Sequence, residues 1–451
     1  LSTAPGTFAS QPAINASVPY GKKGFSLINV MPNHLSLISL LKHNNYHTKF
    51  LIGFNPDFDN MGGFIRRQGT DFILLKYPAK YKEMGIGAEG WSMGYPDDAL
   101  YERSFTIMDS LPHKPYFHIY HTGTTHMPYL FDQQKIYEKK FEAKLPTLKV
   151  NKEIKNILRE TKNVITTFMF SDDCLRDFFK TYQKRKEFDN TIFVITGDHH
   201  IGSFPSTSGI DDYYVPLIIY SPLLKTPRRF YSVNTHNSIT PSIAGLLFNN
   251  YPSLSNKPKQ SPWLTGPLDT AAHFRNTHSM PFMLWSREIT DYIYKEYYLS
   301  GNMLYKMESG MKIHMIKDDT LKNKMIGLRD NFKLINNYVT ENNLVYPENE
   351  SANLEKRTLL YEFNNPKQFD YIFNNSDTTI LPALHIDNTY KNIYVELNAE
   401  VKIDDKKYED QPAIRLAIID TTKGNRNFLF WSNHNIVQLT KNDFDIESWN
   451  A

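Results

Sequence analysis

Residues 193–201, FVITGDHHI, decide the fold that we expect for this chain. Residues 193–195 form a short apolar run that ends at Thr196 and Gly197, a pattern typical of a parallel strand covered on both faces. Gly197 lets the backbone turn sharply, so residues 198–200, Asp-His-His, would project beyond the carboxyl end of the strand, where open α/β sheets bind ligands. A carboxylate beside an imidazole suits a divalent cation such as Mn²⁺, Mg²⁺ or Zn²⁺. Taken alone, these residues also fit a polar loop whose histidines bond to the backbone.

The segments around this stretch alternate between helix and strand. Apolar strand patterns occur at residues 47–52, 116–120 and 214–220, and helical patterns lie after Thr7 and at 35–43, 97–111, 153–185 and 236–247. Strands that alternate with helices over about 250 residues predict an α/β fold with a doubly wound sheet and helices on both faces.

Two further side chains are candidates for the same edge of the sheet. The strand at 116–120 is followed by HTGTTHMPY, which places His126 near the carboxyl end of a second strand. Thr7 lies where a helix running toward Ser17 should begin, and backbone N–H groups there favour a phosphate or an alkoxide. An ordinary helix cap is the alternative role for Thr7.

The length of 451 residues predicts two domains. We expect the first at 1–347, with a C-terminal subdomain at 257–347 that contains a β-hairpin around residues 300–302 and a helix at 328–339. After the polar linker ENESANLEK the pattern changes to short alternating strands, which predict a β-sandwich at 348–451.

Composition narrows the functional classes. The net charge of +3 is small for this length and its lysines and arginines are scattered, so no nucleic-acid groove is expected. The single cysteine, Cys174, excludes an internal disulfide and a cysteine-based zinc site. No apolar run approaches 18 residues. The first residues, LSTAPGTFAS, contain no strand that could build a core, so we expect the domain's first strand to precede Leu1.

Several segments together resemble the lipoteichoic acid synthase and phosphoglycerol/phosphoethanolamine transferase group of the sulfatase and alkaline phosphatase superfamily. The similar runs are GWSMGYPDDALYERSF at 90–105, THMPY at 125–129, TGDHH at 196–200, DDYYVPLIIYSP at 211–222 and THNSITPSIAGLL at 235–247. The resemblance covers roughly residues 1–345 and implies an alkaline phosphatase/sulfatase-like fold.

The resemblance also implies a metal-dependent transfer through a phospho-threonine. A cation, most often Mn²⁺ with Mg²⁺ or Zn²⁺ as alternatives, would activate the threonine hydroxyl and stabilise charge on the phosphate oxygens. The donor would be a phospholipid head group, phosphoglycerol or phosphoethanolamine, and the acceptor a glycan or glycolipid. By this resemblance Thr7 is the nucleophile and a metal ligand, Asp198 and His199 are metal ligands, and His126, His200 and Ser203 contact the substrate.

Two departures from the family pattern concern the metal and the head group. The acidic residue that ends the family's first strand would precede Leu1; the segment IESWN at 446–450 resembles it only superficially. Where glycerol-phosphate enzymes carry His, Trp and Arg, this chain has Ile52, Asp59 and Met61. A different head group, such as phosphoethanolamine, or a different acceptor is therefore expected.

Three alternatives to this transferase differ in chemistry. A phosphodiesterase or phosphatase of the same fold would use water as the acceptor. A sulfatase would need a cysteine or serine for formylglycine, but Cys174 lies in an amphipathic helical pattern and is expected to be a core thiol. A catalytically silent glycan- or lipid-binding protein is the third. Because the family takes head groups from the outer leaflet, we expect an extracytoplasmic domain, bound to a bacterial membrane through a region N-terminal to this sequence.

Overall fold

The chain divides into two compact units, Leu1–Tyr346 and Pro347–Ala451, close to the expected boundary after residue 347. In this computed structural model the described residues are 1–18, 21, 24, 31–88, 90–110, 114–204, 206, 208–251, 254, 258 and 260–346, and the strands 398–401, 413–420, 427–435 and 447–450.

A three-stranded parallel sheet lies at the centre of the first unit. Strand β1 (His47–Ile52) pairs with β3 (Tyr116–His121) on one side and with the short β2 (Phe72–Ile73) on the other, giving the order β2-β1-β3. Both β1 and β3 were expected from the sequence. Because side chains alternate along β1, Phe50 and Ile52 enter one buried cluster and Leu51 enters another.

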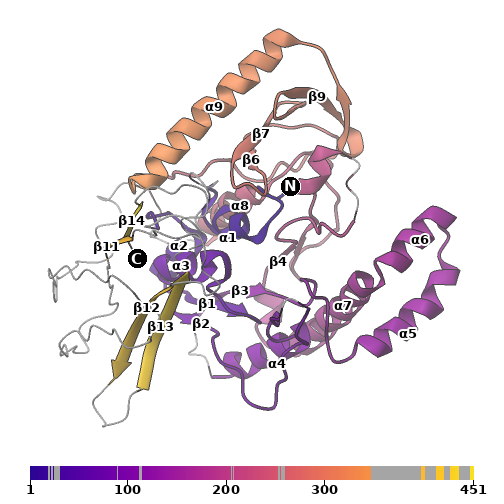
Figure 1. Cartoon of the computed structure of the whole chain (residues 1–451), viewed down its shortest axis with the longest axis vertical. Coiled ribbons are helices and arrows are strands. Elements are labelled where there is room, and N and C mark those ends of the chain that lie inside the picture. The colour runs from indigo at the N-terminus through magenta and orange to yellow at the C-terminus, as the bar shows by residue number, and fades with distance from the viewer. Residues whose placement is uncertain are drawn as a thin grey trace. The chain divides into compact units, whose positions relative to one another are not determined.

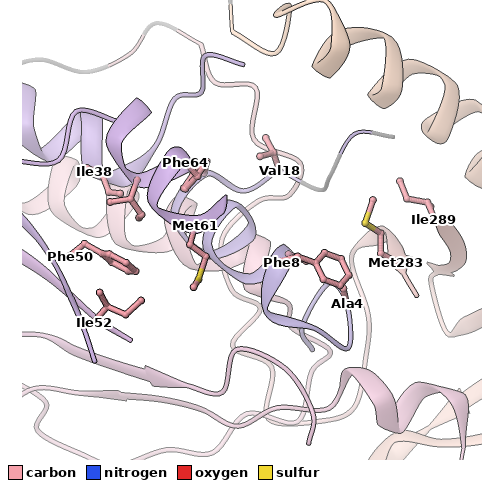
Figure 2. Close-up of a cluster of buried hydrophobic side chains, with 13 residues drawn as sticks. Ala4, Phe8, Val18, Ile38, Phe50, Ile52, Met61, Phe64, Met283 and Ile289 are labelled. Atoms are coloured by element: carbon pink, nitrogen blue, oxygen red, sulfur yellow. The ribbon is translucent and has the colours of Figure 1, made fainter. Parts of the chain in front are cut away.

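Helices cover both faces of this sheet (Figure 1). The cluster around Phe50 and Ile52 contains residues of the first three helices, whereas Leu51 packs against residues of the fourth. Figure 2 shows Phe50, Ile52, Ile38 and Phe64 gathered in the first cluster. The helices before residue 300 are α1 (Ser10–Ala16), α2 (Leu37–His43), α3 (Met61–Arg67), α4 (Asp97–Met108), α5 (Gln134–Lys144), α6 (Lys152–Glu160), α7 (Lys162–Tyr182) and α8 (Ile239–Asn250).

The helical stretch expected at 153–185 forms two helices. Thr161 separates α6 from α7 and has a backbone conformation outside the helical region, with φ −98° and ψ 21°. Among the described residues, none of the helices combines the length and the apolarity that crossing a bilayer requires.

The strand in FVITG differs from expectation in its pairing. Strand β4 (Phe193–Thr196) is present, but it pairs antiparallel with β5 (Leu217–Tyr220), and its residues are only half-buried. The prediction of a parallel strand covered on both faces was therefore wrong. An apolar run does not define the direction of the neighbouring strand, and the short β5 returns beside β4 after a 20-residue excursion.

The segment expected as a C-terminal subdomain forms an antiparallel sheet and a long helix. Its strands are β6 (Ser279–Met283), β7 (Ile289–Tyr294), β8 (Tyr297–Ser300), β9 (Met303–Glu308) and β10 (Lys312–Met315), in the order β10-β9-β8-β7-β6. The β8–β9 hairpin turns at Gly301, whose φ of +57° favours glycine. Helix α9 (Asp319–Glu341), which begins nine residues before the expected helix, packs against β7 and β8.

In the second unit the structure describes two antiparallel pairs. Strand β11 (Asn398–Val401) pairs with β14 (Glu447–Asn450), and β12 (Ala413–Asp420) pairs with β13 (Asn427–Asn435). The IESWN segment thus overlaps a strand of this unit. The remainder of the expected β-sandwich, and its packing, lie outside the described residues.

Candidate functional site

Thr7 opens the first helical segment of the chain. A 3₁₀ turn, η1 (Thr7–Ala9), begins at this residue after an extended Gly6 and continues directly into α1, in agreement with the expected helix start. Thr7 is buried, and its hydroxyl donates to Asp198 Oδ2 at 3.0 Å across 191 residues of sequence. The fold therefore brings together the expected nucleophile and the expected metal ligand.

His199 directs one of its ring nitrogens at the same carboxylate. Its Nδ1 lies 2.6 Å from the carbonyl oxygen of His200, so Nδ1 carries the proton and donates it to that oxygen. The opposite nitrogen, Nε2, is 3.6 Å from Asp198 Oδ2. A ring nitrogen and a carboxylate oxygen thus lie near each other beside the Thr7 hydroxyl, an arrangement that a shared cation would stabilise.

His121, the last residue of β3, is a third group at Asp198, which the sequence reasoning did not single out. Its Nε2 lies 3.9 Å from Asp198 Oδ2, and its Nδ1 is 2.8 Å from Gln11 Nε2. Asn15 Nδ2 donates to Gln11 Oε1, which orients the Gln11 amino group toward His121. His121 Nδ1 is therefore an acceptor, and Nε2–H points toward the carboxylate.

These neighbours set the charge of Asp198. Burial acts to raise the pKa of Asp198, but His199, His121 and the Thr7 hydrogen bond outweigh it, so the pKa lies below its ordinary value. Burial lowers the pKa of His121, which Asp198 only partly offsets. The site therefore holds an ionised carboxylate next to neutral imidazole at His121 near pH 7.

The loop after β3 carries His126 and is fixed by a buried carboxylate. His126 Nδ1 lies 2.8 Å from the carbonyl oxygen of Met127 and donates to it, so Nε2 is the ring nitrogen left for another partner. Its ring lies between two half-exposed aromatic rings, 5.8 Å from Phe58 and 5.9 Å from Trp91. Asp97 at the start of α4 accepts hydrogen bonds from the backbone N–H groups of this loop's residues Gly123 and Thr124.

The remaining two expected contact residues follow the DHH segment. Ser203 Oγ lies 2.9 Å from Tyr129 OH, which links the segment after β4 to the loop that carries His126. His200 contributes its carbonyl oxygen to His199, and within the described residues no hydrogen bond of its half-buried imidazole is recorded. Their proposed contacts with substrate stay predictions.

His236 holds the backbone turn that precedes Asp198. Its Nε2 donates to the carbonyl oxygen of Gly197 at 3.0 Å, at the turn that delivers Asp198. Burial lowers the pKa of His236 to about 3, so this ring is neutral and a donor at Nε2. It lies at the start of the THNSITPSIAGLL run, but a histidine ahead of a helix gives no signal by itself.

The departures from the family pattern now have locations. Ile52 and Met61 are buried in the cluster of Figure 2, while Asp59 forms an ion pair with Arg287. Cys174 is buried within α7 in a separate apolar cluster, and burial raises the pKa of its thiol, in agreement with a core role.

The residues present fit a cation only in part. Asp198, His199 and Thr7 offer two oxygens and one nitrogen of the types that bind divalent metals. Across the described residues, no group of three His, Cys, Asp or Glu side chains has the spacing to hold an ion.

Proteins of known structure share the fold that forms this site. The solved structure of a protein in the alkaline phosphatase superfamily from Vibrio parahaemolyticus is 20% identical, with a TM-score of 0.50, and the alignment covers 77% of this chain and 78% of that one. At this identity the likeness concerns the fold, and it confirms the expected α/β alkaline phosphatase-like architecture.

Two other solved structures are those of a lipoteichoic acid synthase and a phosphoglycerol transferase. The lipoteichoic acid synthase LtaP from Listeria monocytogenes is 16% identical over 73% of this chain and 82% of that one, with a TM-score of 0.47. The phosphoglycerol transferase GacH from Streptococcus pyogenes is 15% identical over 48% and 57%, with a TM-score of 0.31. The family described as Sulfatase matches residues 2–249, which include Thr7, His126, Asp198 and His199. The chain belongs to the sulfatase family.

Proposed function

We propose that this chain is a metal-dependent phosphotransferase that moves a phospholipid head group, phosphoglycerol or phosphoethanolamine, to a glycan or glycolipid through a phosphorylated Thr7. The 3.0 Å hydrogen bond from Thr7 Oγ1 to Asp198 Oδ2 carries the proposal, because it joins the expected nucleophile to the expected metal ligand. Members of this superfamily are enzymes. We propose that this chain also needs a bound metal ion for its reaction.

Thr7 attacks the phosphorus atom of the donor. The Thr7 Oγ–phosphorus bond forms, the bond from phosphorus to the diacylglycerol oxygen breaks, and that oxygen leaves with a proton as diacylglycerol. The head group is then attached to Thr7. In the second step an acceptor hydroxyl attacks the same phosphorus, and Thr7 regains its proton.

Asp198 alone is too weak a base for this step. It accepts the hydrogen bond of Thr7, but its pKa is depressed, so it stays ionised and leaves the proton on the hydroxyl. A divalent cation held by Asp198 Oδ2, His199 Nε2 and Thr7 Oγ1 would supply Lewis acidity, which lowers the pKa of bound water from 15.7 to roughly 7 in zinc enzymes. The residues around Asp198 thus keep its carboxylate ionised, which is the state that binds a cation.

His126 and Ser203 would contact the head group. Since His126 Nδ1 bonds to Met127, the opposite nitrogen Nε2 would bond to a polar group of the glycerol or ethanolamine. Donors of this kind lie in the outer leaflet, so we also propose an extracytoplasmic location at the bacterial membrane. A topology reporter fused to the full-length protein tests that location.

The experiment compares Thr7→Ala with Thr3→Ala in the full-length protein supplied with Mn²⁺. Thr3 lies in the same segment and is buried, but its hydroxyl has no hydrogen-bond partner among the described residues, so it is a matched control. With fluorescent phosphatidylglycerol or phosphatidylethanolamine, Thr7→Ala should lose about a thousand-fold or more in turnover. Thr3→Ala should stay within about threefold of the natural protein.

Three results discriminate between the chemistries. A trapped phosphate adduct on the peptide that contains Thr7, found by mass spectrometry, supports the covalent route. Head group released to water with no acceptor product assigns a phosphodiesterase instead. Unchanged turnover in Thr7→Ala refutes the proposal.

A further inference from the structure

The turn between β6 and β7, residues 284–288, lies against the segment that carries Thr7. At its base Met283 N donates to the carbonyl oxygen of Thr3 at 2.9 Å. Met283 and Ile289, the strand residues on either side of the turn, share one buried cluster with Ala4 and Phe8, as Figure 2 shows. A small sheet far along the sequence is therefore packed directly onto the nucleophile segment.

Trp285 in this turn is exposed next to the reacting groups. It is 64% exposed, although its indole ring lies 5.9 Å from the ring of His199 at an angle of 79°. It also contacts the residue before the nucleophile, since a Cβ atom added to Gly6 would lie 2.9 Å from Trp285 Cζ3. An indole so exposed gains nothing for folding from most of its surface, because that surface remains in water.

Arg287 holds this turn in place. Its Nη2 donates to Asp59 Oδ1 at 2.9 Å, and its guanidinium lies 4.7 Å from the centre of the Phe8 ring. Asp59 and Arg287 have φ values of 50° and 61°, in the left-handed region that residues with a Cβ rarely adopt. Such strain persists only where surrounding contacts hold it, and it is often found at ligand sites.

The polar and apolar groups here suit one kind of ligand. The exposed indole of Trp285, with the imidazole of His199 beside it, fits a ring with apolar C–H faces and hydroxyls at its edge. The half-buried ion pair of Asp59 and Arg287 holds the turn that carries this indole. A lipid chain would instead need a continuous apolar surface.

We propose that Trp285 stacks against a sugar ring of the acceptor, with Arg287 and Asp59 as positioning residues that fix the turn. This inference rests on the proposed transfer to a glycan, and it names the element that binds that glycan. Because Trp285 contacts Gly6, a sugar on its face has its hydroxyls beside the residue that carries the phosphorus atom. The β6–β7 turn thereby determines which acceptor is used.

Binding is measured without catalysis, so that this inference can fail independently of the proposed function. Chitotriose, cellotriose and maltotriose are titrated into the full-length protein and into its Thr7→Ala form by ligand-observed NMR. We expect at least one of them to bind both forms equally. Trp285→Ala should weaken that binding by about tenfold or more, and Trp285→Phe should restore most of it.

A control variant and the variants of Arg287 test the role of the turn separately from that of the nucleophile. Tyr338→Ala removes another exposed aromatic ring, on α9, and should change nothing. Arg287→Met should raise the acceptor KM without slowing formation of the Thr7 adduct, and Arg287→Lys should partly reverse this. The inference is overturned if none of the sugars binds, if Trp285→Ala binds them normally, or if it weakens only glycerophosphoethanolamine, which would assign Trp285 to the head group.

Discussion

Removing the Asp97 carboxylate should release the loop that carries His126. Asp97 is 2% exposed, and its Oδ1 accepts from Gly123 N at 3.2 Å, Thr124 N at 3.1 Å and Thr124 Oγ1 at 2.7 Å. Its Oδ2 accepts from Ser171 Oγ on α7 at 2.7 Å. One carboxylate thus joins α4, α7 and the loop after β3.

The cost of Asp97→Ala follows from the donors that lose their acceptor. The two hydroxyls can rotate toward other acceptors, but the two backbone N–H groups cannot, and each unsatisfied buried group costs about 1–3 kcal/mol. A local loss of about 2–6 kcal/mol corresponds to at least about a 30-fold larger population of the open loop. Asp97→Asn keeps the Oδ1 acceptor, so its effect should be several times smaller.

Hydrogen exchange measured by mass spectrometry on a peptide spanning 116–130 checks this directly. Ser171→Ala is the matched control, because it removes one partner of Oδ2 and leaves both loop N–H groups bonded. We expect exchange to increase in the order natural protein, Ser171→Ala, Asp97→Asn, Asp97→Ala, with the KM of the donor rising in the same order. Unchanged exchange in Asp97→Ala would show that the carboxylate does not hold the loop.

Other predictions concern buried titratable groups and the site network. Burial lowers the pKa values of His34 and His236 to about 3, so the unfolded chain takes up protons below about pH 6.5 and the folded chain does not. At pH 5 each ring should therefore lower the free energy of unfolding by about 2 kcal/mol. The urea concentration at the unfolding midpoint should decrease when the pH is lowered from 7 to 5, and a constant midpoint would contradict this. Cys174 should resist Ellman's reagent until the chain is unfolded, because its thiol is buried with a raised pKa; rapid labelling of the folded protein would be contrary to this. Gln11→Leu should lower kcat more than it raises KM, because His121 would lose the partner that sets its tautomer, whereas Gln11→Glu should shift the pH profile; identical profiles would exclude that role.

The sequence predicted the site best where a residue with a chemical role lies at the end of a predicted strand or at the start of a predicted helix. Gly197 after an apolar run predicted the turn that exposes Asp198, and the helix start predicted the position of Thr7. Neither pattern by itself could show that the two side chains meet, since the 3.0 Å contact spans 191 residues. The family resemblance supplied that pairing.

Other site residues were missed because their role depends on a partner from elsewhere in the chain. His121 ends a strand in the same run as His126, but only the approach of Gln11 and Asp198 distinguishes it from a structural histidine. The position of Gln11, four residues after Thr7 on a helix, was a usable signal, because residues at that spacing share a helix face. The direction of β5 beside β4 left no comparable signal, since apolar runs look alike in parallel and antiparallel pairs.

The loop after β1 connects the altered family pattern to the proposed acceptor site. Ile52 and Met61 are turned into the core, so neither can line a head-group pocket. Asp59 is instead bound to Arg287 and helps to fix the turn that presents Trp285 beside His199. A segment that differs from the glycerol-phosphate enzymes thus contributes its carboxylate to an element from the small antiparallel sheet. If that pairing sets specificity, exchanging residues 284–288 should change acceptor use while formation of the Thr7 adduct continues.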